Sequence, residues 1–122
     1  MIIVIDDSKT IRSILKDYLT KIGYSVRVAD DGVAGIDLYN SIEKIDAVLT
    51  DIDMPFLDGN HVAQHIRTHE KDHTPILAVT GSDDSLIAAE LFDRILHKPL
   101  RVVELKSALM SIIKDSNLRK SL

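Results

Sequence analysis

Short apolar runs rich in β-branched residues alternate along this chain with longer stretches of helical periodicity. The first run is the continuous Ile-Ile-Val-Ile segment at residues 2–5, and further short, mostly apolar segments, two of which include Arg27 and His97, cover 26–29, 47–50, 76–79 and 95–97. Continuous apolar runs of this length are typical of strands that are buried on both faces. The pattern therefore predicts five short strands.

Between these runs, apolar residues recur at the three- and four-residue spacing of an amphipathic helix. The recurrence predicts helices over about 11–22, 33–39, 62–66, 84–92 and 102–113. Asp7 or Ser8 can cap the first helix, and Gly23 can end it in the left-handed conformation. Five strand–helix repeats predict an α/β fold, a doubly wound five-stranded parallel sheet of (βα)₅ type with helices on both faces.

The length of 122 residues suits one domain over residues 1–122, and no linker or internal repeat divides it. Apolar residues make up 45% of the chain and charged residues 28%, a composition typical of globular proteins. The last residues, 115–122, are polar and partly basic, and we expect them to fray.

The net charge and the amino-acid composition argue against several kinds of function. The net charge of −4 argues against direct binding of nucleic acid. The chain has no cysteine, which excludes disulfides and thiolate chemistry. No apolar run is long enough for a membrane span or a signal-peptide core, so we expect a cytoplasmic protein without membrane insertion.

Polar and charged residues follow four of the five predicted strands at the point where each strand ends. They are Asp6 and Asp7, Asp51, Thr80 and Lys98. The carboxyl ends of parallel strands meet at one edge of the sheet, which is where open α/β sheets bind ligands. Two carboxylates about 4 Å apart repel by roughly 4 kcal/mol at an effective dielectric near 20. A group of three therefore requires a proton or a cation, and Mg²⁺ accepts such oxygen ligands.

Taken singly, each of these residues is as readily a helix cap, a turn residue or a solvated strand end. Together they indicate phosphoryl chemistry. A carboxylate such as Asp51 beside a metal is a competent nucleophile that forms an aspartyl-phosphate. Thr80 and Lys98 supply a hydroxyl and an ammonium for the phosphoryl oxygens.

Four ordered motifs extend this interpretation. They are Val4-Ile5-Asp6-Asp7-Ser8, Thr50-Asp51-Ile52-Asp53-Met54-Pro55-Phe56-Leu57-Asp58-Gly59, Val79-Thr80-Gly81 and His97-Lys98-Pro99-Leu100. In this order and spacing they resemble the receiver domain of bacterial two-component response regulators, of the CheY-like, flavodoxin-like type. The resemblance covers nearly the whole chain and implies the strand order 2-1-3-4-5.

The resemblance implies a role for each acid. Asp51 is expected to be the phosphoacceptor, charged from a phosphohistidine on a histidine kinase or a histidine phosphotransfer protein. Asp7 and Asp51 are expected to bind Mg²⁺, or Mn²⁺, directly. Asp6 would act through water, and the main-chain carbonyl of Asp53 would complete the protein ligands.

The remaining motif residues are implied to hold the phosphoryl group and to switch the domain. Thr80 is expected to move onto the phosphoryl group, and Lys98 to pair with it. Pro99 is expected to follow a cis peptide bond. In many receivers the switch residue three positions before the lysine is aromatic, but here it is Ile95, which predicts switching without aromatic rotation.

Two further features depart from the family pattern. The stretch from Thr80 to Lys98 is shorter by roughly one helical turn, which puts the helix expected over 84–92 in question. Asp53 carries a carboxylate two residues beyond the acceptor, where it could act on a water near the acyl phosphate or simply face solvent.

The function implied is that of a stand-alone receiver, not an enzyme beyond its own phosphorylation and dephosphorylation. It would switch the binding of an unknown protein target or pass its phosphoryl group on. We expect a monomer, with dimerisation on phosphorylation as an option. A haloacid-dehalogenase-type phosphatase using Asp51 and Asp53, and a pseudo-receiver used only as a binding module, are the alternatives.

Overall fold

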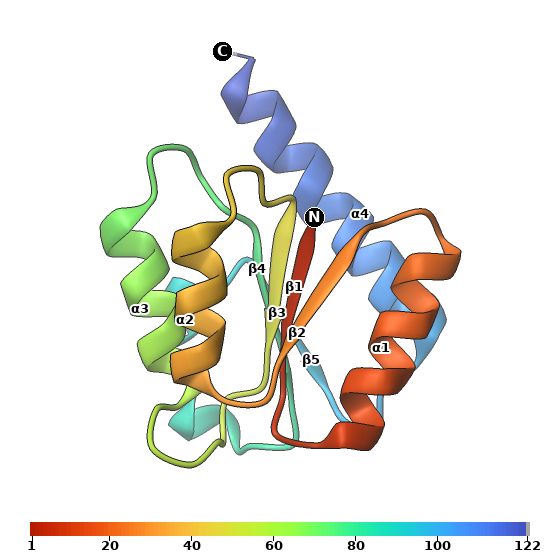
Figure 1. Cartoon of the computed structure of the whole chain (residues 1–122), viewed down its shortest axis with the longest axis vertical. Coiled ribbons are helices and arrows are strands. Elements are labelled where there is room, and N and C mark those ends of the chain that lie inside the picture. The colour runs from red at the N-terminus through yellow and green to blue at the C-terminus, as the bar shows by residue number, and fades with distance from the viewer. Residues whose placement is uncertain (122) are drawn as a thin grey trace.

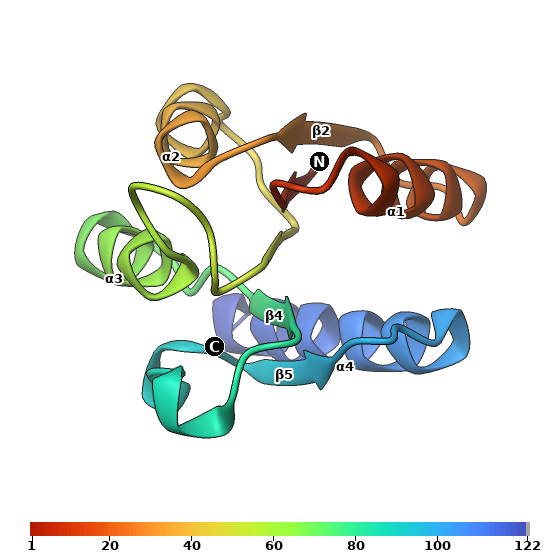
Figure 2. The same ribbon diagram turned by 90° about the horizontal axis from the view of Figure 1, so that it is seen from below.

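The computed structural model describes residues 1–121 as a parallel sheet with two helices on each face (Figures 1 and 2). The five strands are β1 (Ile2–Ile5), β2 (Val26–Ala29), β3 (Ala47–Thr50), β4 (Ile76–Thr80) and β5 (Arg94–His97). Their order in the sheet is β2-β1-β3-β4-β5, and every pair is parallel. The predicted fold class and strand order are confirmed.

Burial along the strands follows their position in the sheet. All residues of β1, β3 and β4 are buried, whereas the edge strands β2 and β5 are partly exposed. This explains why the central strands read as unbroken apolar runs, since each side chain faces a layer of helices.

The helices divide into two pairs around the sheet. Helices α1 (Lys9–Lys21) and α4 (Val102–Lys120) cover one face, and α2 (Gly32–Ser41) and α3 (Gly59–His69) cover the other (Figure 2). Each face has its own apolar core, the first centred on residues such as Leu19 and Leu109 and the second on residues such as Ile5 and Ile66.

Three helices begin at the carboxyl edge of the sheet with a polar cap. The side chains of Ser8, Asp31 and Asp58 each accept a hydrogen bond from a backbone N–H in the first turn of α1, α2 and α3. Such caps satisfy N–H groups that a helix start leaves without a partner. They fix where each helix leaves the edge that carries the acids.

The helix expected over residues 84–92 is absent, so the structure corrects that prediction. Two 3₁₀ turns replace it, η1 (Asp84–Leu86) and η2 (Ala89–Leu91). Ile87 and Phe92 are the residues that this stretch buries in the core. Their spacing of five does not match one face of an α-helix, and Ile87 is extended between the turns.

The C-terminal part of the chain is also more ordered than its composition indicated. Helix α4 continues to Lys120 and extends past the amino edge of the sheet (Figure 1). Ser116 is buried, and its hydroxyl donates to the carbonyl oxygen of His73 at 2.8 Å. This contact explains why residues 115–120 do not fray as expected, and residue 122 lies outside the described residues. No helix within residues 1–121 is both long and apolar enough to cross a membrane.

A buried charge network joins the end of α3 to the start of β5. The guanidinium of Arg67 donates to Glu70 at 3.0 Å and to Asp93 at 2.9 Å. It also donates to the carbonyl oxygens of Thr74 at 2.7 Å and Leu91 at 3.1 Å. The side chains of Arg67, Glu70 and Asp93 are each only 16% exposed, so each charge depends on the others.

We predict that Arg67→Met lowers the free energy of unfolding by about 3–5 kcal/mol, because it removes the guanidinium that pairs with the largely buried carboxylates of Glu70 and Asp93. Urea denaturation at neutral pH measures the loss. Lys71→Met is the matched control, since Lys71 is exposed and forms no ion pair within residues 1–121. Equal stability of the two variants would contradict this role for Arg67.

Candidate functional site: a carboxylate cluster at the carboxyl edge of the sheet

Three carboxylates converge where β1 and β3 end. Strands β1 and β3 are neighbours, with Ile5 paired to Thr50, so the residues that follow them are adjacent. The N–H of Asp51 donates to the carbonyl oxygen of Ile5 at 2.9 Å, which locks this alignment. One carboxylate oxygen from each of Asp6, Asp7 and Asp51 lies within 4.8 Å of the others. The convergence expected from the sequence is therefore present.

Lys98 enters the same cluster from the end of β5. Its ammonium lies 3.0 Å from Oδ2 of Asp6 and 3.1 Å from Oδ2 of Asp51. Burial would by itself lower the pKa of Lys98, but hydrogen bonds and charge attraction from Asp6 and Asp51 outweigh it and raise the pKa above 10.5. The Lys98–Pro99 peptide bond is cis, as the motif implied.

Backbone groups orient the two buried acids. Oδ1 of Asp51 accepts from the N–H of Ile52 at 2.7 Å, and Oδ1 of Asp6 accepts from the N–H of Ser8 at 2.8 Å. Arg12, one turn into α1, donates to the carbonyl oxygen of Asp6 at 2.7 Å. Sequence reasoning missed Arg12, because a basic residue on a helix surface gives no signal that its side chain binds the loop before that helix.

The other two acids are exposed. Asp7 and Asp53 face solvent, and neither takes part in an ion pair within residues 1–121. Asp7 is therefore free to bind a ligand, whereas both oxygens of Asp6 already accept hydrogen bonds. The side chain of Asp53 does not join the cluster of three, and only its main-chain carbonyl was expected to take part.

The cluster fits a small hard cation. Two oxygen ligands of one octahedral Mg²⁺ ion lie about 3 Å apart when adjacent and about 4 Å apart when opposite. The three carboxylates are close to this spacing, and their chemistry suits an ion that keeps several waters. The structure thus contains a group of acids that could bind a metal.

Thr80 lies at the end of β4 with its side chain turned into the protein. The residue is fully buried, and its hydroxyl oxygen accepts from the N–H of Ser82 at 3.0 Å. The carbonyl oxygen of Thr80 accepts from the N–H of Lys98 at 2.9 Å, which ties the two strand ends together. Ile95 is half-buried against the apolar core on the α3 side of the sheet.

The backbone of Asp51 is supported by the start of α3. The N–H of Gly59 donates to the carbonyl oxygen of Ile52 at 2.9 Å. A Cβ atom on Gly59 would lie only 2.1 Å from the carbonyl oxygen of Asp51, so this approach requires glycine. Because residue 59 is a glycine, the start of α3 packs directly against the backbone of Asp51, the residue that follows β3.

Comparison with known proteins gives the family. Residues 2–110 match the family described as the response regulator receiver domain. The chain is a response regulator receiver domain. The strand order and the acids at the carboxyl edge agree with this assignment, and the comparisons favour neither the phosphatase nor the pseudo-receiver.

Relatives of this receiver domain include longer regulators. Response regulator MprA of Mycobacterium sp. (strain KMS) is 37% identical over 120 residues, which cover 95% of this chain and 51% of that protein. The probable transcriptional regulator ycf27 of Cyanidium caldarium is 33% identical over 98% of this chain and 49% of that protein. The receiver domain described here thus spans about half the length of the curated relatives it matches.

Solved structures agree with the fold. A response regulator receiver domain protein from Clostridium thermocellum is 30% identical, with a TM-score of 0.87 over 96% of each chain. The response regulator TrrA from Thermotoga maritima, solved in complex with Mg²⁺-BeF, is 31% identical, with a TM-score of 0.83 over 91% of this chain and 96% of that chain.

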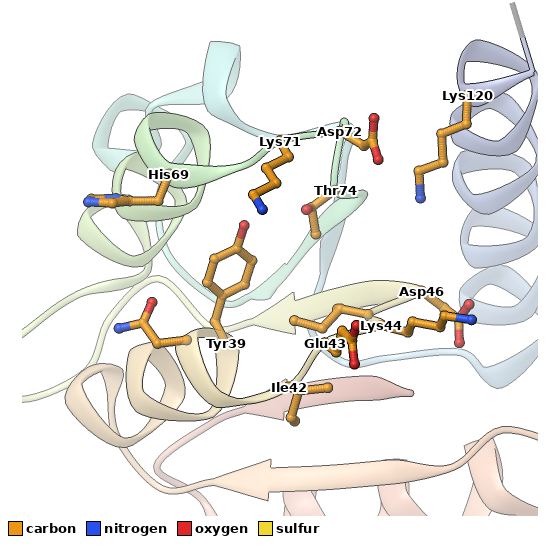
Figure 3. A pocket seen from close by; sticks show the side chains of 12 residues that line it. Tyr39, Ile42, Glu43, Lys44, Asp46, His69, Lys71, Asp72, Thr74 and Lys120 are labelled. Atoms are coloured by element: carbon orange, nitrogen blue, oxygen red, sulfur yellow. The ribbon is translucent and has the colours of Figure 1, made fainter.

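A separate concavity of about 660 Å³ lies at the opposite, amino edge of the sheet (Figure 3). Lys71 and Lys120 line it, close to the ends of α3 and α4. Cations at the C-terminal ends of helices offset the negative end of the helix dipole. These lysines therefore have a structural explanation, and the receiver domain's candidate site is the carboxylate cluster.

We predict that Lys98→Met lowers stability at neutral pH and that its difference from the parent shrinks in alkali. Because the folded pKa of Lys98 is raised, its contribution is complete below the unfolded value of 10.5 and is lost as pH rises through the folded value. Urea unfolding from about pH 8 to above the folded pKa measures this difference.

Lys44→Met is the control for this experiment, because Lys44 is exposed and forms no ion pair in the described part of the chain. Its difference from the parent should not change with pH. A constant difference for Lys98→Met as well would show that Lys98 does not hold the acids.

Proposed function

We propose that Asp51 accepts a phosphoryl group from a phosphohistidine on a histidine kinase or a histidine phosphotransfer protein. The observation that carries this proposal is the environment of Asp51. Its carboxylate is 9% exposed, with one oxygen held by the N–H of Ile52 and the other beside the ammonium of Lys98. A fixed carboxylate beside a cation and two further acids is arranged for attack on a phosphorus atom.

In the transfer, an Asp51 oxygen bonds to phosphorus while the bond from phosphorus to the histidine nitrogen breaks. The electron pair of that bond stays on the imidazole nitrogen. The product is an acyl phosphate on Asp51 and a free histidine on the donor. Such transfers depend mainly on positioning and on charge stabilisation.

Asp7 and Asp51 would hold Mg²⁺ directly and Asp6 through water, with Mn²⁺ as a substitute. The exposure of Asp7 supports its role as a direct ligand. Asp6 and Asp51 each already accept two hydrogen bonds, so the division between these two follows from the resemblance to the family. The carbonyl oxygen of Asp53 would complete the protein ligands. When bound, the ion would offset the negative charge that collects on the phosphoryl oxygens.

Lys98 and Thr80 would then respond to the new charge. The ammonium of Lys98 is already within reach of Asp51, so it can exchange its contact with Asp6 for a phosphoryl oxygen. The hydroxyl of Thr80 would leave the N–H of Ser82 and donate to another phosphoryl oxygen. Ile95 would adjust within the core beside β5 without the ring movement of an aromatic residue.

The rim of the site suits a protein donor. Phe56, in the loop between β3 and α3, is 99% exposed, and Val103, at the start of α4, is 78% exposed. Both lie in segments that follow the carboxyl ends of β3 and β5, and exposed apolar side chains are typical of protein contact surfaces. The outcome we propose is switched binding of a protein target, or onward phosphoryl transfer, by a cytoplasmic domain that is monomeric before phosphorylation.

We predict that Mg²⁺ with beryllofluoride raises the melting temperature of the parent protein, because beryllofluoride on Asp51 binds only the folded state. Ligand at about 100 times its dissociation constant adds about 2.7 kcal/mol. Asp51→Asn should lose the shift, and Asp53→Asn should keep it, since its main-chain carbonyl is unchanged. A shift that persists in Asp51→Asn would contradict the proposal.

A second prediction concerns the lifetime of the acyl phosphate. The Asp53 side chain faces solvent and makes no hydrogen bond within residues 1–121, so Asp53→Asn should leave the lifetime unchanged. Decay of the phosphorylated protein after removal of the donor measures it. A change of tenfold, or about 1.4 kcal/mol in the barrier, would instead show that the Asp53 carboxylate acts on the hydrolytic water.

A further inference from the structure

The segment that replaces a helix, residues 84–92, is attached to α3 at two places of different character. One attachment involves Asn60 in the first turn of α3, and the other involves Arg67 two turns later. Isolated 3₁₀ turns have little stability of their own, so these attachments determine how the segment sits.

The amide of Asn60 binds the backbone between the two 3₁₀ turns on both sides. Its Nδ2 donates to the carbonyl oxygen of Leu86 at 2.8 Å, and its Oδ1 accepts from the N–H of Ala88 at 2.9 Å. These two hydrogen bonds, here called the latch, hold Ile87 against the core at 8% exposure. Leu86 beside it is 64% exposed, so solvent reaches the latch.

The attachment at Arg67 is buried and multiply connected. Arg67 donates to the carbonyl oxygen of Leu91 and pairs with Asp93. Asp93 also accepts from the N–H of Ile76 at 2.8 Å and contacts His73 at 2.6 Å. Because opening this end would break several linked contacts at once, it is the fixed end of the segment.

Two sets of contacts connect the latch to the site around Asp51, the proposed phosphoacceptor. Asn60 follows Gly59, which packs against the backbone of Asp51. In the other set, the hydroxyl of Thr80 holds the N–H of Ser82, two residues before η1 begins. A change at either Asp51 or Thr80 therefore acts on the segment close to the latch and far from Arg67.

We propose that Asn60 is a latch that opens when Asp51 is phosphorylated, with the segment turning about its fixed end at Arg67. This proposal rests on the proposed function of Asp51. When the hydroxyl of Thr80 turns to the phosphoryl group, Ser82 loses its partner and the start of η1 is released. The two hydrogen bonds of the latch then break. Ile87, next to the exposed Leu86, becomes accessible to a binding partner.

Amide hydrogen exchange on the full chain tests the latch, with and without Mg²⁺ and beryllofluoride. The N–H of Ala88 reports on the latch, and the N–H of Ile76 reports on the fixed end. In the parent, beryllofluoride should speed exchange at Ala88 about tenfold and leave Ile76 unchanged. Asn60→Ala should show the fast exchange without beryllofluoride and no further increase with it.

Two variants control the comparison. Gln64→Ala, one turn along α3, removes an amide that binds only Thr68 within residues 1–121, and it should behave as the parent. Asn60→Asp keeps the acceptor for Ala88 and loses the donor to Leu86, so its exchange should be intermediate.

Two results would overturn the latch. One is a melting-temperature shift with beryllofluoride in which exchange at Ala88 stays constant, and the other is a response of Asn60→Ala equal to that of the parent. Absence of the temperature shift itself would instead contradict the proposed function of Asp51.

Discussion

One electrostatic constraint underlies the site. Three carboxylates meet at one edge of the sheet, and within residues 1–121 the ammonium of Lys98 is the one that pairs with them. Asp6 and Asp51 are almost fully buried and share the ammonium of Lys98. Like charges this close are tolerated only with a cation nearby. The parallel pairing of β1 with β3 creates the crowding, and β5 brings the lysine that relieves it.

That arrangement leaves negative charge uncompensated at Asp7, the exposed member of the cluster. In the function proposed above, a divalent ion and a phosphoryl group would complete this site. The end of the neighbouring strand β4 carries Thr80, and the start of α3 is hydrogen-bonded to Ile52, the residue after Asp51. Any rearrangement of charge at Asp51 thus acts directly on the segments that follow β3 and β4.

Much of this could be predicted from the sequence because its signals are local. Unbroken β-branched runs indicated buried strands, and the acids, hydroxyl and lysine lie at their ends. The short stretch between Thr80 and Lys98 put the helix over residues 84–92 in question, but the sequence pattern did not predict the two 3₁₀ turns that replace it and bury Ile87 and Phe92. Likewise, the polar composition of residues 115–122 gave no indication that the hydroxyl of Ser116 donates a hydrogen bond to the carbonyl oxygen of His73.

Other contacts could not be predicted from the pattern of apolar and polar residues. Asn60 and Arg67 lie on α3 and bind backbone groups 26 and 24 residues away in the sequence, and Arg12 lies on α1 and binds the loop just before that helix. Such contacts depend on how elements pack, which periodicity does not encode.

The most direct test of the central claim is to locate the phosphoryl group itself. The protein is incubated with Mg²⁺ and a radiolabelled small phosphodonor such as acetyl phosphate, and the labelled peptide is identified. The account predicts label on the peptide that contains Asp51, with none in Asp51→Asn or when Mg²⁺ is removed by a chelator. Stable label on another residue, or equal labelling of Asp51→Asn, would contradict it.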